Sequence, residues 1–128
     1  MARLLCLDVE QRKLIEVECN DLQDYYNALG CDCFDIARIY IGCKKFDCFV
    51  DDNGLLKENP IPSAVSKSKE VLLVGNIIFA NHDDEGNTTS LTDEDIAIIK
   101  RNMALLIKGN NECVLLAVIG SYFNDSDS

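Results

Sequence analysis

The sequence lacks an apolar run of the length that a membrane helix requires, and it lacks the glycine-rich phosphate-binding motifs. Spanning a bilayer takes roughly 20 consecutive apolar residues, and charged residues interrupt every apolar stretch before that length. Neither G-x-G-x-x-G nor G-x4-G-K-[ST] occurs, which excludes the common nucleotide-binding loops. The first residues include a short apolar run, but Asp8 and Glu10 follow without a small-residue cleavage site. We therefore predict a first strand there and not a signal peptide.

Basic residues are also few. The chain has 12 Lys and Arg against 22 Asp and Glu, a formal net charge of -10. Because phosphate binding needs clustered Lys and Arg, we predict no direct binding to nucleic acid and none to anionic membranes. The single histidine, His82, could pair with Asp83 or Asp84, but no nucleophile motif lies beside it. The prediction is therefore that the protein is not an enzyme.

Length and composition favour one folded domain. Apolar residues make up 48% of the 128 residues, which excludes wholesale disorder, and this length is enough to bury an independent core. We predict a single α+β domain over residues 1–123, followed by a disordered acidic tail over residues 124–128. The expected location is cytoplasmic.

The seven cysteines are many for this length, and their number is odd. Without a secretion signal, the default is reduced thiols that serve as small apolar core residues. The pairs Cys31-x-Cys33 and Cys43-x4-Cys48 lack the C-x2-C spacing that structural zinc sites favour. We predict no zinc, no other metal and no cofactor.

The most apolar stretch, Val71 to Ala80 (VLLVGNIIFA), is predicted to form one strand buried on both faces at the centre of a sheet. Gly75 interrupts this stretch. A glycine inside such a strand marks a bulge or a close approach of other atoms. The expectation is that a larger side chain at Gly75 would overpack a filled space.

Two helices and several further strands surround this stretch. One helix is predicted from an N-cap at Asn20 to a stop at Gly30, and the other from a cap at Thr92, with Asp95 at the capping-box position, to Gly109. An Asn-Gly turn is predicted at Asp51 to Gly54. The conformation of Ser63 to Lys69 is left open between a helical turn and a loop. Further strands are predicted at residues 3–8, 13–18, 34–41, 46–50, 55–57 and 113–119.

This order of elements does not alternate regularly between strand and helix. It favours an α+β fold: a mixed, mostly antiparallel sheet of five or six strands, with the two helices packed on one face.

One stretch stands out by its charge. Residues 82–99 hold six carboxylates and no Lys or Arg. One interpretation is a solvated loop that leads into a helix whose N-terminal dipole favours acid. The other is a patch that binds a basic partner, and its predicted partner-binding residues are Asp83, Asp84, Glu85, Asp93 and Glu94.

Several segments, LQDYYNALG, DDNGLLKENPIP, VLLVGNIIFA and LTDEDIAIIKR, resemble an uncharacterised family of small acidic proteins carried by phages and conjugative elements, a domain of unknown function. The resemblance covers Ile15 to Arg101. The chain departs from the pattern at Ser63 and Ala64, where an asparagine and a basic residue are expected. The resemblance implies a mobile-element setting and carries no activity or catalytic residues. Its main markers are Leu22-Gln23, Gly30, Asn53-Gly54-Leu55, Pro60 and Gly75.

Two functional hypotheses follow. The first is a non-enzymatic accessory protein of a mobile element that binds a host protein with a basic surface, with counter-defence as one such role. The alternative is a small-ligand binder that sequesters a signalling nucleotide at the interface of a homo-oligomer. The predicted ligand-binding residues of that alternative are Lys57, Phe79, Lys100 and Arg101.

Overall fold

The structure, a computed structural model, describes residues 2–9, 11–31, 33–42, 44–51, 62–66, 71–107, 113–119 and 121–123. The predicted turn at residues 51–54 beyond Asp51, the predicted strand at 55–57 and the predicted tail at 124–128 lie outside these residues. In chain order the elements are β1 (Ala2–Asp8), β2 (Lys13–Cys19), α1 (Leu22–Leu29), β3 (Phe34–Ile41), β4 (Lys44–Asp51), β5 (Pro62–Ser66), β6 (Val71–Val74), β7 (Ile77–His82), β8 (Thr88–Thr89), α2 (Asp93–Arg101), β9 (Met103–Ile107), β10 (Cys113–Ile119) and β11 (Ser121–Phe123).

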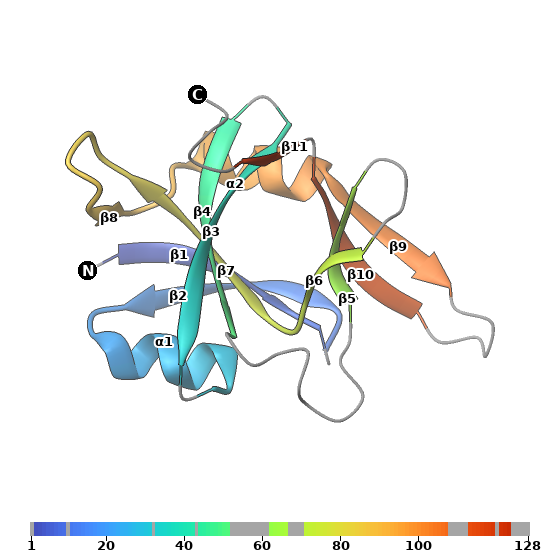
Figure 1. Ribbon diagram of the computed structural model, residues 1–128, viewed down its shortest axis with the longest axis horizontal. Coiled ribbons are helices and arrows are strands. Elements are labelled where there is room, and N and C mark those ends of the chain that lie inside the picture. The colour runs from blue at the N-terminus through green and yellow to red at the C-terminus, as the bar shows by residue number, and fades with distance from the viewer. Residues whose placement is uncertain are drawn as a thin grey trace.

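The larger sheet has the strand order β11-β3-β4-β7-β1-β2, and the short β8 pairs with β7 (Figure 1). Every pairing in this sheet is antiparallel. The predicted α+β class and the mostly antiparallel sheet are therefore confirmed. A smaller sheet, with the order β6-β5-β10-β9, was not predicted, and its β5 and β10 run parallel.

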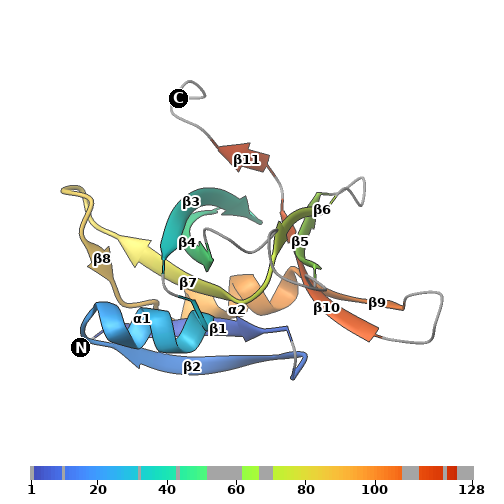
Figure 2. The ribbon, with the colours of Figure 1, turned by 60° about the horizontal axis from the view of Figure 1, so that its bottom comes forward.

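The helices pack on opposite faces of the larger sheet (Figure 2). On β1, Leu4 packs in the cluster that contains Leu29 of α1, whereas the next residue, Leu5, packs in the cluster that contains Ile99 of α2. The prediction that both helices lie on one face is wrong. The physical reason is that the central strands are apolar on both sides, so each face needs its own cover. Ala64 of the smaller sheet packs on the α2 side.

Helix α1 is held on its face by aromatic side chains. The ring of Tyr25 stacks on the ring of Phe49 of β4, with the two ring centroids 4.7 Å apart. The ring centroids of Tyr26 and Phe34 of β3 are 5.4 Å apart. Aromatic pairs at such distances add stabilisation beyond the buried area. The short helix is thus fixed by packing more than by its own propensity.

The predicted C-terminal end of α1 is confirmed, and its predicted N-cap is not. Gly30 adopts the left-handed conformation with φ 68° and ends the helix, as expected. The N-cap is Asp21, whose carboxylate accepts a hydrogen bond from the Asp24 backbone N–H at 3.0 Å, so the prediction of Asn20 is wrong by one residue. Both residue types are good N-caps, and the spacing to the apolar positions did not separate them.

The stretch Val71 to Ala80 forms two strands and not one. Its first part is β6 in the smaller sheet, and its second part is β7, which lies between β4 and β1 at the centre of the larger sheet. Gly75 lies between them with φ 81°, and a Cβ added there would meet no heavy atom within 4 Å. Gly75 is therefore required by the backbone turn and not by close packing, so Gly75→Val is expected to destabilise through backbone strain.

Helix α2 is shorter than predicted. It ends at Arg101, where the Asn102 side chain donates to the Ile98 carbonyl at 2.8 Å, and residues 103–107 form β9. The apolar residues 103–107 pair with β10, with Met103 opposite Ala117. Pairing with a strand that is distant in sequence overrides the helical apolar stripe.

The segment left open at Ser63 to Lys69 begins as a strand, because Pro62–Ser66 is β5. Its register with β6 shifts twice, and the Ser63 side chain is buried.

Neither described helix has the length and apolarity to cross a bilayer.

Candidate functional site

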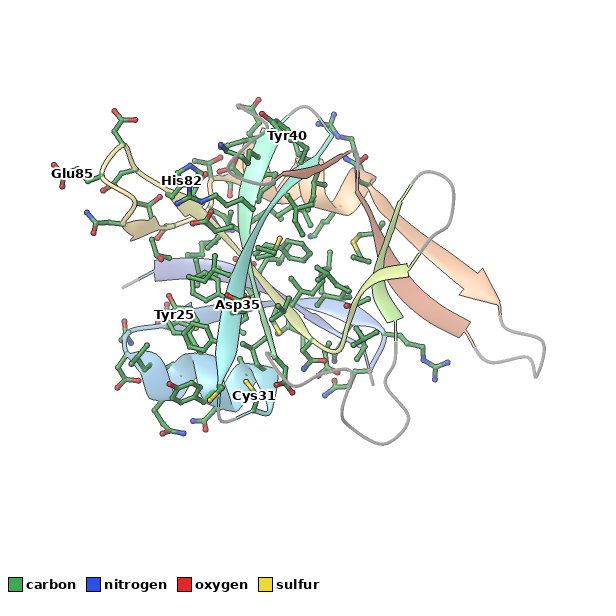
Figure 3. The ribbon with its side chains drawn as sticks, in the orientation of Figure 1. Tyr25, Cys31, Asp35, Tyr40, His82 and Glu85 are labelled. Atoms are coloured by element: carbon green, nitrogen blue, oxygen red, sulfur yellow. The ribbon has the colours of Figure 1, made fainter. Side chains whose placement is uncertain are left out.

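The predicted partner-binding carboxylates lie in two places. Asp83, Asp84 and Glu85 form the exposed loop between β7 and β8, and Glu85 projects from its tip (Figure 3). Asp93 and Glu94 begin α2 and are also exposed. All five are accessible to a partner.

Within the loop, Asp83 has a structural role. Its carboxylate accepts hydrogen bonds from the backbone N–H groups of Glu85 at 2.9 Å and Asn87 at 2.8 Å. These bonds, first of all the one from the Asn87 backbone, lower the pKa of Asp83 below its ordinary value. No side-chain hydrogen bond or ion pair joins Asp84 or Glu85 to another described residue. Asp83 therefore shapes the loop and presents its two neighbours.

The start of α2 is built around a buried carboxylate. Thr92 and Asp95 form the predicted capping box, with the Asp95 backbone N–H donating to the Thr92 hydroxyl at 3.1 Å. The Asp95 carboxylate also accepts from Lys44 Nζ and from Asn81 Nδ2. Burial alone would raise the pKa of Asp95, but the bonds from Lys44 and Thr92 outweigh it and the pKa is lowered.

The strand pairing adds acidic residues that the sequence analysis missed. Glu16 and Glu18 are exposed on the edge strand β2, opposite Leu5 and Arg3 of β1. The Arg3 guanidinium contacts both Glu16 and Asp93, which brings β2 and the start of α2 together. Only the β1–β2 register places Glu16 and Glu18 here. We call the set Glu16, Glu18, Asp84, Glu85, Asp93 and Glu94 the acidic surface.

The residues predicted for the alternative ligand site do not form one group. Phe79 lies in the α2-side core and is 1% exposed. Lys100 and Arg101 are exposed in the last turn of α2. Lys57 lies outside the described residues.

His82 is not paired with the acids of its own loop. Its Nδ1 lies 3.3 Å from Oδ1 of Asp47 on the neighbouring strand β4. The sequence predicted a pairing of His82 with Asp83 or Asp84, because the sequence alone does not indicate that β4 pairs with β7.

The described cysteines show the surroundings of core residues in three cases. Cys6, Cys19 and Cys48 are buried. Burial raises the pKa of the Cys6 thiol to about 12 and that of Cys19 to about 11. Of the four cysteines considered as zinc ligands, Cys48 lies in the α2-side core, Cys31 and Cys33 lie between α1 and β3, and Cys43 is outside the described residues. Among the residues that the structure describes, no three His, Cys, Asp or Glu side chains are grouped closely enough to hold a metal ion.

The fold and this surface define an α+β domain that carries an acidic surface at one end. The family model described as "Domain of unknown function (DUF3846)" matches residues 2–104, and the chain belongs to this family. No curated protein and no solved structure shows significant similarity to the chain.

Proposed function

We propose that this protein is a non-enzymatic accessory protein that binds a basic protein partner through the acidic surface. The observation that carries the proposal is the contrast at the loop tip. Asp83 is used to shape the loop, whereas Asp84 and Glu85 are exposed and make no side-chain bond to the rest of the described chain. Carboxylates presented in this way without a role in folding are suited to an intermolecular contact.

Charge supports the same proposal. The chain carries a net charge of -10, and Arg3 is the one described cation that contacts members of the acidic surface. The field of such a surface extends about a Debye length, ~8 Å at physiological salt, and speeds the encounter with a basic protein. The same field opposes nucleic acid and anionic lipid.

The setting of the proposal comes from the sequence resemblance. The resemblance supports a phage or conjugative element as that setting and nothing beyond it. The cytoplasmic location, the basic host partner and a role in counter-defence are parts of our proposal. The alternative, sequestration of a signalling nucleotide in an oligomer, has less support, because Phe79 is buried in the core.

The experiment compares capture of host proteins by matched variants. Asp84→Asn removes one charge at the tip, and Asp35→Asn removes the same charge from an exposed residue of β3, distant from Glu85 in Figure 3. We expect basic proteins, identified by mass spectrometry, to be retained by the unaltered protein and by Asp35→Asn. They should be lost progressively with Asp84→Asn and with Asp84→Asn combined with Glu85→Gln.

Raising the salt concentration should release the same proteins, because exposed charges are screened. Capture that the double variant leaves unchanged would contradict the proposal. Retention of a small molecule with no protein would favour the nucleotide alternative.

A further inference from the structure

A second polar cluster lies on the α1 side of the larger sheet, next to the loop that carries Asp84 and Glu85. It is formed by one residue from each of three adjacent strands: Arg38 of β3, Asp47 of β4 and His82 of β7. Arg38 Nε lies 3.5 Å from Asp47 Oδ1, and His82 Nδ1 lies 3.3 Å from the same oxygen. Figure 3 shows His82 at the end of the sheet away from α1, where Tyr25 and Cys31 are labelled.

The three side chains differ in exposure. Asp47 is buried, with 6% of its side chain exposed, whereas the side chains of Arg38 and His82 are 45% and 24% exposed. Burying a carboxylate is costly unless charged partners compensate. Here one buried carboxylate oxygen lies within 3.5 Å of two partly exposed cation-forming side chains, and neither Asp47 Oδ1 nor His82 Nδ1 has a hydrogen-bond partner among the described residues.

The outer donors of both side chains remain available. A guanidinium has five N–H donors, and only Arg38 Nε is turned to Asp47. No hydrogen bond joins its other nitrogen atoms to any part of the chain that the structure describes. His82 turns Nδ1 to Asp47, which leaves Nε2 on the opposite side of the ring.

Further polar side chains continue this face of the sheet. Tyr40 and Lys45 form the next same-face pair along β3 and β4, two residues from the Arg38 and Asp47 pair. The acid that follows His82 is Asp83, but its carboxylate is turned into its own loop by the N–H groups of Glu85 and Asn87. The cluster therefore places two cation-forming side chains, Arg38 and His82, around the single carboxylate of Asp47 on a protein that is acidic elsewhere.

We propose that Arg38 and His82, positioned by Asp47, bind the phosphate group of a small phosphorylated ligand. The planar fork of arginine matches the oxygens of a phosphate, and bonds between two charged groups are the stronger ones. Ile36 lies two residues before Arg38 on the same face and is 47% exposed, one of two exposed large apolar side chains among the described residues. It would contact an apolar or flat body attached to the phosphate.

The first test titrates the full-length protein with inorganic phosphate and with adenosine monophosphate, followed by amide chemical shifts and calorimetry. Wild type should bind both at millimolar concentrations or below, with shifts centred on β3, β4 and β7. Arg38→Gln should weaken phosphate binding at least about tenfold, the size expected for a lost charged hydrogen bond. Lys13→Gln removes the same charge from an exposed residue at the start of β2 and should leave binding unchanged.

Asp47→Asn separates a positioned site from simple charge attraction. Removing this negative charge would strengthen the binding of an anion if attraction alone were responsible. If binding depends on the orientation that Asp47 gives to Arg38 and His82, Asp47→Asn should instead bind phosphate more weakly. His82→Gln should also weaken phosphate binding. Melting curves establish whether each variant is folded. If Asp47→Asn does not fold, Arg38→Gln, which changes a partly exposed side chain, still tests the proposal.

Ile36→Ser tests the contact with the ligand body. It should reduce binding of adenosine monophosphate to the level of inorganic phosphate and leave phosphate itself unaffected. Three results would overturn the proposal: no binding to wild type at millimolar phosphate, equal binding by Arg38→Gln, or an equal loss in Lys13→Gln. Capture of basic proteins through Asp84 and Glu85 is independent of all three.

Discussion

Asp95 and Glu85 lie in the same acidic stretch of the sequence, and their surroundings are opposite. Asp95 is buried, closes the capping box of α2 and accepts bonds from Lys44 and Asn81. Glu85 is at the tip of an exposed loop, and its side chain bonds to no other described residue. The comparison teaches that a run of like charges contains both structural and presented carboxylates. Substitutions should separate the two kinds.

The largest expected effect is at Asp95. Asp95→Ala removes the capping box and leaves Lys44 and Asn81 without their acceptor, so the free energy of unfolding should fall by about 2 to 4 kcal/mol. Urea unfolding measures this loss. The matched control is Glu94→Gln, one residue earlier and exposed, which should change stability by less than ~0.5 kcal/mol. Equal losses of the free energy of unfolding in Asp95→Ala and Glu94→Gln would show that Asp95 is no more important for folding than an exposed carboxylate.

The pH dependence of the free energy of unfolding should show the contribution of Asp95. Because the pKa of Asp95 is lower in the folded protein than its ordinary value of 3.8, its contribution is present above that value. The contribution is lost as the pH falls through the folded pKa. Stability measured from ~pH 6 down to about pH 2 should therefore decline less steeply in Asp95→Asn than in wild type.

A smaller effect is expected at Asp83. Asp83→Ala removes the acceptor that shapes the loop, so the loop should be cut faster in limited proteolysis while the melting temperature falls only slightly. Asp84→Ala, at the neighbouring exposed residue, should be cut at the wild-type rate. If both variants are cut equally fast, the hydrogen bonds of Asp83 do not hold the loop.

The smallest effect on stability is expected at the tip. Asp84→Asn combined with Glu85→Gln should change the free energy of unfolding by less than ~0.5 kcal/mol, because neither side chain bonds to the described fold. Thermal and urea unfolding measure this change. A loss above about 1 kcal/mol would show that the tip contributes to folding, and would weaken its assignment to a partner.

Local signals explain most of what the sequence predicted correctly. The stop at Gly30 and the capping box of Thr92 and Asp95 depend on a few neighbouring residues. The strands predicted at residues 3–8, 13–18, 34–41 and 46–50 follow from alternating residues between short turns. Such features require no knowledge of distant parts of the chain.

The features that were missed depend on distant pairing. An apolar run at residues 103–107 fits a helix as well as a strand, and the pairing with β10 decides between them. Glu16 joins the acidic surface only because β1 brings Arg3 beside it. The cluster of Arg38, Asp47 and His82 likewise needs three strands in register. Periodicity carries no information on these contacts.

The last two strands have a consequence for how much of the chain must fold together. The family match ends at residue 104, yet β10 lies between β5 and β9, and β11 covers the edge of β3. A fragment cut at residue 104 would lose the middle of the smaller sheet and would expose the backbone groups of β3 to pairing with other chains. The cooperative folding unit is thus longer than the segment that the family model matches, and shortened versions should aggregate where the full chain does not.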